Sequence, residues 1–326
     1  MKKLVYSCPF VPAEWIAAHG LRPSRILPGL ADASAFAGAS AGVCPYAAAF
    51  LHTVCSDCEA DAVVVTTACD QMRRGFEQAD RAGHRPVFLL NVPTSWQTVT
   101  AQEIYISEVR RLGRFLVRLG GKEPPADDLA RVMREYDAKR SLLWEARGRV
   151  SPRRYSEAIV RFHREGTVDL DSSGPAHALR RIPVALVGGP LIPHHFQIFD
   201  LIERGGGAVV LDATESGERT MPSTFDRRML SDDPFMALVD AYFGKIPDAF
   251  RRPNSQLYQW LKREISERGI RGIIFRYYTW CDTWHAELQR MKEWSEVPLL
   301  GISTGTDEHI DGHTTSRIES FLEMLK

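Results

Sequence analysis

The first hundred residues alternate short apolar runs with helical patterns. The apolar, β-branched runs that predict buried strands are residues 3–7, 24–27, 62–65 and 87–90. A helix is expected over 13–19, where Gly20 ends it, and another begins near Asp70. Strands that alternate with helices in this way predict a parallel sheet with right-handed crossovers.

The rest of the chain divides into a helical part and a second alternating part. From about residue 98 to 166 apolar positions recur at helical spacing, with a break at the Glu-Pro-Pro sequence of 123–125. Beyond it, strands are predicted at 183–187, 208–211, 272–275 and 298–302, and a final amphipathic helix at 315–325. We therefore expect an α/β unit over 1–97, a helical segment over 98–180 and a second α/β unit over 181–326.

Composition restricts the partners and the location. A chain of 326 residues exceeds what one hydrophobic core usually serves. Lys plus Arg (41) equals Asp plus Glu (41), and this zero net charge argues against a nucleic-acid partner. No apolar run reaches the length of a membrane span, and no signal-peptide core follows Met1. We expect a cytoplasmic protein with no membrane partner.

The cysteines are clustered, with five of the six in the first 69 residues. Cys44 precedes a proline that suits the first turn of a helix. Cys69 and Cys281 each follow a predicted strand and precede a predicted helix. A helix N-terminus favours the thiolate form, and the carboxyl ends of strands are where open α/β sheets bind ligands. We expect these three thiolates to form one site.

The spacing of the cysteines bears on what they hold. Zinc prefers four ligands in closed pairs, and Cys55 with Cys58 supplies the one C-x-x-C pair of the sequence. Three thiolates from distant segments suit a cubane iron–sulfur cluster with one iron left open. Cys55 or Cys58 is then either a fourth ligand or a small residue at helical spacing. Cys8 ends the first predicted strand and is expected to line the pocket.

Two other motifs resemble catalytic or metal-binding patterns, and two nucleotide-binding motifs are absent from the sequence. Residues 301–305 (GISTG) match the nucleophile-elbow pattern, but no helix follows them at once. His309 and His313 stand four apart like zinc ligands, yet Gly312 between them indicates a turn. Neither G-x-G-x-x-G nor a P-loop occurs, so no ATP site of those kinds is expected.

Five motifs in chain order resemble the 2-hydroxyacyl-CoA dehydratase and benzoyl-CoA reductase subunit family, in its dehydratase component D form. They are the opening YSCPFVPAEWI at 6–16, VCPY at 43–46, TACD at 67–70, WCD at 280–282 and TSRIESFLEM at 315–324. The resemblance spans about residues 4 to 325. The chain is short for the family, and the segment before Cys44 is compressed.

The resemblance implies two flavodoxin-like (Rossmann-like) parallel-sheet units joined by a helical segment. A [4Fe-4S] cluster would lie between the units on Cys44, Cys69 and Cys281, with one iron site open. It also implies an acyl-CoA substrate and a homologous second subunit, in a heterodimer or homodimer. A separate ATP-dependent [4Fe-4S] activator would supply one electron. The second unit lacks the further cysteines of a double-cubane branch, so a single cubane is expected.

The implied reaction is radical dehydration of a 2-hydroxyacyl-CoA by a lyase. Three alternatives stay open: reduction of an aromatic acyl-CoA by a benzoyl-CoA-reductase-like oxidoreductase, a non-catalytic electron-relay subunit with a closed fourth ligand, and a structural zinc protein. The substrate-pocket candidates are Ser7, Cys8 and Trp96. His285 is expected to transfer protons, because imidazole titrates near neutral pH. Glu14 is either catalytic or a first-turn carboxylate stabilised by the helix dipole.

Overall fold

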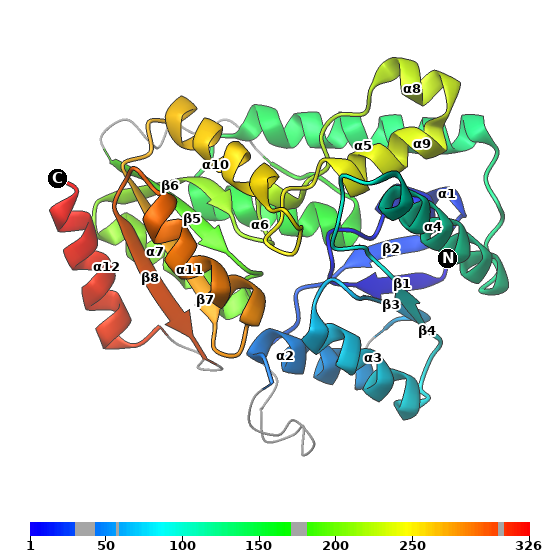
Figure 1. The fold of residues 1–326 in the computed structure, drawn as a ribbon, viewed down its shortest axis with the longest axis horizontal. Helices are drawn as coiled ribbons and strands as arrows, with labels where there is room; N and C mark the ends of the chain where they lie inside the picture. Colours follow the sequence, from blue (N-terminus) through cyan, green and yellow to red (C-terminus); the bar gives the residue numbers. More distant parts are fainter. Residues whose placement is uncertain (30–42, 57–58, 171–180, 306–309) are drawn as a thin grey trace.

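The computed structural model of the chain describes residues 1–29, 43–56, 59–170, 181–305 and 310–326. It contains two four-stranded parallel sheets, which lie one beside the other in Figure 1. The strand orders are β2-β1-β3-β4 and β6-β5-β7-β8. Counted from its own first strand, each sheet has the order 2-1-3-4, as flavodoxin-like sheets begin. The predicted fold of two flavodoxin-like units is confirmed.

The first sheet is built from residues near the N-terminus. Its strands are β1 (Lys3–Tyr6), β2 (Arg22–Arg25), β3 (Ala62–Thr66) and β4 (Val87–Leu90), and its helices are α1 (Ala13–Ala18), α2 (Pro45–Cys55) and α3 (Asp70–Ala82). All five residues of β3 are buried, as its β-branched sequence predicts for a central strand. β2 begins two residues earlier than predicted, because Arg22 pairs with Lys3 of β1.

Three long helices follow the first sheet along the chain. They are α4 (Val99–Arg118), α5 (Ala126–Ala146) and α6 (Pro152–Glu165). α6 contacts β2 and β6, which are edge strands of the two sheets. α5 contacts α1 and runs along one side of the molecule in Figure 1. The helical segment therefore joins the units by packing as well as by sequence.

The second sheet takes up the C-terminal half. Its strands are β5 (Ile182–Gly188), β6 (Gly207–Ala213), β7 (Gly272–Tyr278) and β8 (Leu299–Thr304). The helices are α7 (Gln197–Arg204), α8 (Arg227–Asp232), α9 (Pro234–Val239), α10 (Ser255–Glu267), α11 (Asp282–Trp294) and α12 (Gly312–Met324), with the short turns η1 (Pro193–Phe196), η2 (Glu218–Thr220) and η3 (Asp240–Gly244). Ser303 of the elbow-like motif lies within β8 and is exposed.

One part of the second half packs away from its own sheet. Leu238 of α9 and Phe243 of η3 belong to the hydrophobic core that covers the first sheet. The ring of Phe243 stacks on Tyr105 of α4 with the centroids 4.9 Å apart. The two halves of the chain therefore interlock through residues of the second half that fill the first core.

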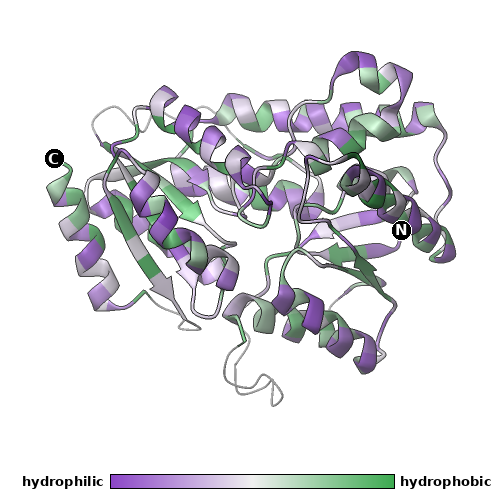
Figure 2. Ribbon diagram, viewed as in Figure 1, coloured by the Kyte–Doolittle hydropathy of each residue, from purple (hydrophilic) through white to green (hydrophobic). Residues whose placement is uncertain are grey.

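The distribution of hydropathy follows these layers. Figure 2 shows hydrophobic residues concentrated in the strands, whereas the outer faces of the helices are largely hydrophilic. This is the pattern expected when helices cover the faces of a parallel sheet. None of the helices in the described residues is long and apolar enough to cross a membrane.

Candidate functional site

A cavity of about 80 Å³ lies where the carboxyl ends of strands from both sheets meet. Its chemically reactive lining residues are Ser7, Cys8, Cys44, Cys69, Glu215, Asp248, Tyr278 and Cys281. They come from the segments after β1, β3 and β6, from the end of β7, from the starts of α2, α3 and α11, and from the loop between η3 and α10. Open α/β sheets bind their ligands at this end of the strands. We call this space the thiol cavity.

Three of its thiols stand at the beginnings of helices, as the sequence predicts. Cys44 is the residue before α2, with Pro45 in the first turn. Cys69 stands in the same position before α3, and Cys281 before α11. The first-turn N–H groups of a helix have no partner within the helix and carry partial positive charge. Each of these sulfurs is therefore placed where a thiolate is stabilised.

The thiols of Cys44 and Cys281 interact directly with each other. Their hydrogen bond is the largest influence on both groups: it lowers the pKa of Cys44 and raises the pKa of Cys281. Burial raises the pKa of Cys69 to about 11, against the lowering effect of the Met72 N–H at the start of α3. In the absence of a bound group, Cys44 is the thiol of the three that most readily ionises.

Trp280 shapes the turn that presents Cys281. Its backbone φ of 67° lies in the left-handed region, which residues other than glycine rarely adopt. The side chain is 57% exposed, so packing of the ring does not hold this conformation. Strained backbone of this kind concentrates at functional sites, where the turn orients a neighbouring group. Here the neighbouring group is the thiol-bearing residue before α11.

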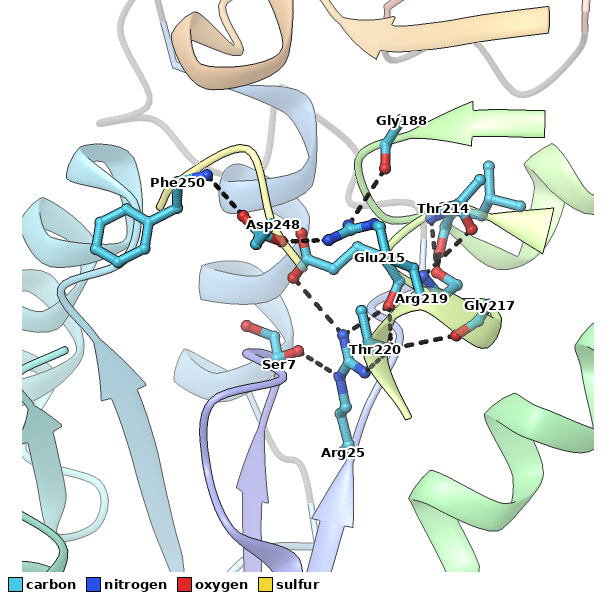
Figure 3. Close-up of polar contacts among 12 residues, drawn as sticks. Ser7, Arg25, Gly188, Thr214, Glu215, Gly217, Arg219, Thr220, Asp248 and Phe250 are labelled. Atoms are coloured by element: carbon cyan, nitrogen blue, oxygen red, sulfur yellow. Dashed lines mark hydrogen bonds and ion pairs between the residues drawn. The ribbon is translucent and has the colours of Figure 1, made fainter. Parts of the chain in front are cut away.

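A buried arginine ties the two halves of the chain together beside the thiol cavity (Figure 3). Arg25, at the end of β2, donates from Nε to the carbonyl oxygen of Ser7 at 2.7 Å. Its other nitrogens donate to Thr220 Oγ1 and to the carbonyl oxygen of Glu215, each at 2.8 Å. The Glu215 carboxylate lies 3.6 Å away as an ion pair. This arginine therefore fixes the loop after β6 against the first unit.

A second arginine holds the other carboxylate of the cavity. Arg219 is fully buried and pairs with Asp248, which also accepts a hydrogen bond from the Phe250 N–H at 2.8 Å (Figure 3). The guanidinium lies over the Trp284 ring at 4.8 Å. Burial and the nearby Asp248 carboxylate raise the pKa of Glu215 to about 7, although Arg25 and Arg219 act to lower it. Glu215 can therefore hold or release a proton near neutral pH.

The structure brings two of the three predicted pocket residues to the cavity. Ser7 and Cys8 line it, and burial raises the pKa of Cys8 to about 12. Trp96 does not line it; its indole N–H donates to the carbonyl oxygen of Pro253 at 2.8 Å. The sequence placed Trp96 after β4 but could not predict this contact with a loop from the second half.

Glu14 lies in α1, away from the thiol cavity, and is fully buried. Its carboxylate accepts hydrogen bonds from Arg140 and from the Tyr242 hydroxyl, both at 2.6 Å. These three residues belong to α1, α5 and η3, so the carboxylate joins three segments that are distant in the chain. These contacts and the distance from the cavity favour a structural role for Glu14 over the catalytic alternative.

His285 also lies outside the cavity. Its ring is exposed and stacks on Tyr277, with centroids 5.1 Å apart and planes at 13°. The expected placement assumed that a residue four positions after Cys281 shares its face of the helix. Cys281 precedes α11, however, and Thr283 and Trp284 are the residues of this helix that line the cavity. Proton transfer by His285 is not supported by this position.

Cys55 and Cys58 were the two candidates for a fourth cluster ligand. Cys55 is the last residue of α2, at the opposite end of the helix from Cys44. At about 1.5 Å per residue, that length separates the two residues by roughly 16 Å. Cys55 is therefore too far along the helix to join Cys44 at one cluster. Cys58, like His309, lies outside the residues that the structure describes.

Several residues at the site were missed by the sequence analysis. Glu215 had a usable signal, because it follows the predicted strand at 208–211 on the side where ligands bind. Arg25 lies in a predicted strand, but its role depends on partners from the second half. Nothing in the sequence indicates that Arg219 pairs with Asp248, since that contact depends on how the loops meet.

Comparison with known families identifies the chain. A family model described as the D-component of 2-hydroxyglutaryl-CoA dehydratase matches residues 8–325. The chain belongs to this family. The match includes Cys44, Cys69 and Cys281, and it confirms the resemblance found in the sequence. No curated protein sequence matches the chain.

The family resemblance implies a [4Fe-4S] cluster, which needs thiolate ligands that converge on one site. Within the described residues, no group of three or more His, Cys, Asp or Glu side chains is arranged to hold a metal ion. The thiol cavity nevertheless has the donors of a thiolate-bound cluster, because Cys44, Cys69 and Cys281 converge on it from three helix starts. Thiolates from well-separated segments are the ligands that iron–sulfur clusters use. The residues fit the group.

Proposed function

We propose that this chain is the iron–sulfur subunit of a 2-hydroxyacyl-CoA dehydratase-type lyase. The observation that carries the proposal is the convergence of Cys44, Cys69 and Cys281 on one cavity between the two α/β units. Membership of the D-component family supports the substrate class. A 2-hydroxyacyl-CoA would react in the thiol cavity after one-electron activation.

Cys44, Cys69 and Cys281 would hold a [4Fe-4S] cluster that keeps one iron site open. When bound, such a cluster would supply low-potential electron transfer and Lewis-acid contact to an oxygen of the acyl-CoA thioester. Cys55 is too distant to close the open site, which favours a catalytic cluster over an electron relay closed by that residue.

The chain's own residues would bind, orient and exclude water. The starts of α2, α3 and α11 stabilise the three thiolates through their first-turn N–H groups. Buried Phe10 and Trp284 in the cavity wall limit the access of water to the reacting atoms. Glu215 would hold the proton that dehydration moves, because its carboxyl lines the cavity with a pKa of about 7.

The proposal extends to the partners of the chain. Its partners would be the acyl-CoA substrate, a homologous second subunit and a separate ATP-dependent [4Fe-4S] activator. A D-component of a dehydratase is by its description one part of a larger enzyme, which supports partner subunits. We propose a cytoplasmic location, since a cluster of this kind requires a reducing compartment.

Anaerobic purification tests this function directly. The protein should contain iron and acid-labile sulfide, and with its partner subunit, the activator and ATP it should dehydrate a 2-hydroxyacyl-CoA. Exposure to air should abolish this activity, because an open iron site also admits oxygen. Zinc in place of iron, or turnover with a mild reductant and no ATP, would contradict the proposal.

A further inference from the structure

Four buried guanidinium groups contact residues that line the thiol cavity, whereas two carboxylates line the cavity itself. The arginines are Arg25, Arg219, Arg251 and Arg276, each no more than 5% exposed. The carboxylates are Glu215 and Asp248. As described above, Arg25 pairs with Glu215 and Arg219 pairs with Asp248. Two buried cations are thus in excess of the carboxylates at this site.

Arg251 is the first of the two. It is fully buried, and its nitrogens donate to the carbonyl oxygens of Pro93 at 2.8 Å and Phe243 at 2.7 Å. It makes no ion pair with a carboxylate in the part of the chain that the structure describes. Its guanidinium lies over the ring of Phe10 at 4.2 Å, and Phe10 lines the thiol cavity. Burial lowers the pKa of Arg251 to about 10, as expected for an under-compensated charge.

Arg276 of the second sheet is the second, and it lies behind the lining residues of the thiol cavity. It lies in β7, donates to the carbonyl oxygen of Pro190 at 3.3 Å and contacts His195. Its guanidinium lies over the ring of Tyr278 at 4.3 Å. Tyr278 and Pro190 both line the thiol cavity. Among the described residues, no carboxylate forms an ion pair with Arg276 either.

A buried cation without an anion is costly, and carbonyl oxygens and ring faces compensate it only in part. The matching negative charge is available inside the cavity, where three thiols converge. Thiolates, and a cluster that becomes more negative on reduction, are the anions that this arrangement would stabilise. Each unpaired arginine is separated from the cavity by one aromatic ring, close enough to act in a low-dielectric interior.

We propose that Arg251 and Arg276 are positioning residues whose uncompensated positive charges set the electrostatic potential of the thiol cavity. They stabilise the reduced, more negative state of the group held by the three thiols and so raise its reduction potential. This inference rests on the proposed function for the identity of that group. The excess positive charge itself is a property of the folded chain.

The reduction potential of the reconstituted protein tests the proposal. In an anaerobic redox titration followed by EPR, Arg251→Gln and Arg276→Gln should each shift the potential to more negative values. Arg251→Lys and Arg276→Lys keep the charge and should stay close to the unmodified protein. Above pH 7, where Glu215 is mostly ionised, Glu215→Gln removes a negative charge from the cavity and should shift the potential in the opposite direction. Unchanged potentials in both Gln variants would overturn the proposal.

A measurement on metal-free protein separates this inference from the proposed function. Iodoacetamide alkylates thiolates, so its rate at Cys44 at a fixed pH follows the thiolate fraction. The rate should fall in Arg251→Gln and Arg276→Gln, and not in the control Arg154→Gln, an exposed arginine of α6. If the protein binds no iron at all, the proposed function fails. The alkylation rates of Cys44 in these variants still show whether the two arginine charges act on the cavity.

Folding is monitored in the same variants by circular dichroism. If Arg251→Gln does not fold, the pair Arg276→Gln and Arg276→Lys decides, because Arg276 lies in a strand that keeps its backbone pairing with β5 and β8. Equal alkylation rates and equal potentials in that pair would refute a role for the charge.

Discussion

Cys44 and Cys281 share a hydrogen bond although they belong to different α/β units. One stands before α2 beside the first sheet and the other before α11 beside the second. The contact lowers the pKa of Cys44 and raises that of Cys281, so in metal-free protein Cys44 loses its proton more readily than Cys281. A group bound to both thiols must bridge the two units.

Removing one thiol should therefore abolish cluster binding. Cys44→Ala, Cys69→Ala and Cys281→Ala should each lose most of their iron. Each variant keeps only two of the three thiolate ligands, so one helix start no longer binds the cluster. Iron and acid-labile sulfide per chain, with the charge-transfer absorption, measure this. Cys55→Ala is the matched control on the far end of α2 and should keep its iron, as should Cys8→Ala. Full iron content in Cys281→Ala would contradict the assignment.

The thiols should differ in reactivity before any metal is bound. At about pH 8.5, near the ordinary thiol pKa, Cys44 should be alkylated faster than Cys69, whose pKa burial raises to about 11. In Cys281→Ala the hydrogen bond is lost, so the pKa of Cys44 should rise and its alkylation should slow. Mass spectrometry of peptides after timed iodoacetamide treatment gives both rates. A Cys44 that reacts equally fast in the variant would show that the hydrogen bond has no such effect.

Glu215 should make stability depend on pH. Burial raises its pKa from 4.5 to about 7, so the folded protein binds a proton that the unfolded chain releases between these values. Stability is therefore lost as pH rises from about 4.5 through 7, by at most about 3 kcal/mol. Glu215→Gln should flatten this part of the profile, measured by urea unfolding of metal-free protein. The same variant should lose turnover near neutral pH while keeping iron.

Glu14 should matter for stability rather than for the reaction. Its carboxylate is fully buried with Arg140 and Tyr242, and removing it leaves the guanidinium without its closest anion. Breaking a buried ion pair costs roughly 3–5 kcal/mol. Glu14→Ala should lower the free energy of unfolding by about this amount, while the folded fraction keeps iron and activity. A Glu14→Ala protein that is as stable as the unmodified protein but has no turnover would show that Glu14 is catalytic.

His285 provides the opposite case, a titratable group that faces solvent. Its ring stacks on Tyr277 outside the cavity, so His285→Ala should keep both its iron and its turnover. Steady-state rates across neutral pH should match those of the unmodified protein. A loss of kcat with unchanged iron would show that the imidazole reaches the reacting atoms.

The sequence by itself determined the elements and the positions of the three thiols. Strand β3 has a continuous apolar sequence, and the starts of α2, α3 and α11 follow local signals such as Pro45 after Cys44. Backbone propensity and hydrophobic pattern depend on a few neighbouring residues, so the amino-acid sequence alone is enough to recognise them. That alternation predicts parallel sheets with right-handed crossovers, but it does not fix the 2-1-3-4 strand order that the structure shows.

Only the tertiary structure decided what surrounds those thiols. Glu14 pairs with Arg140, and Arg219 with Asp248, because helices and loops distant in sequence pack together. Residues four apart share a helix face only when both lie within the helix. Cys281 precedes α11, so His285 does not share its direction and faces outward. Such contacts depend on the relative placement of whole elements, and local sequence carries no measure of that placement.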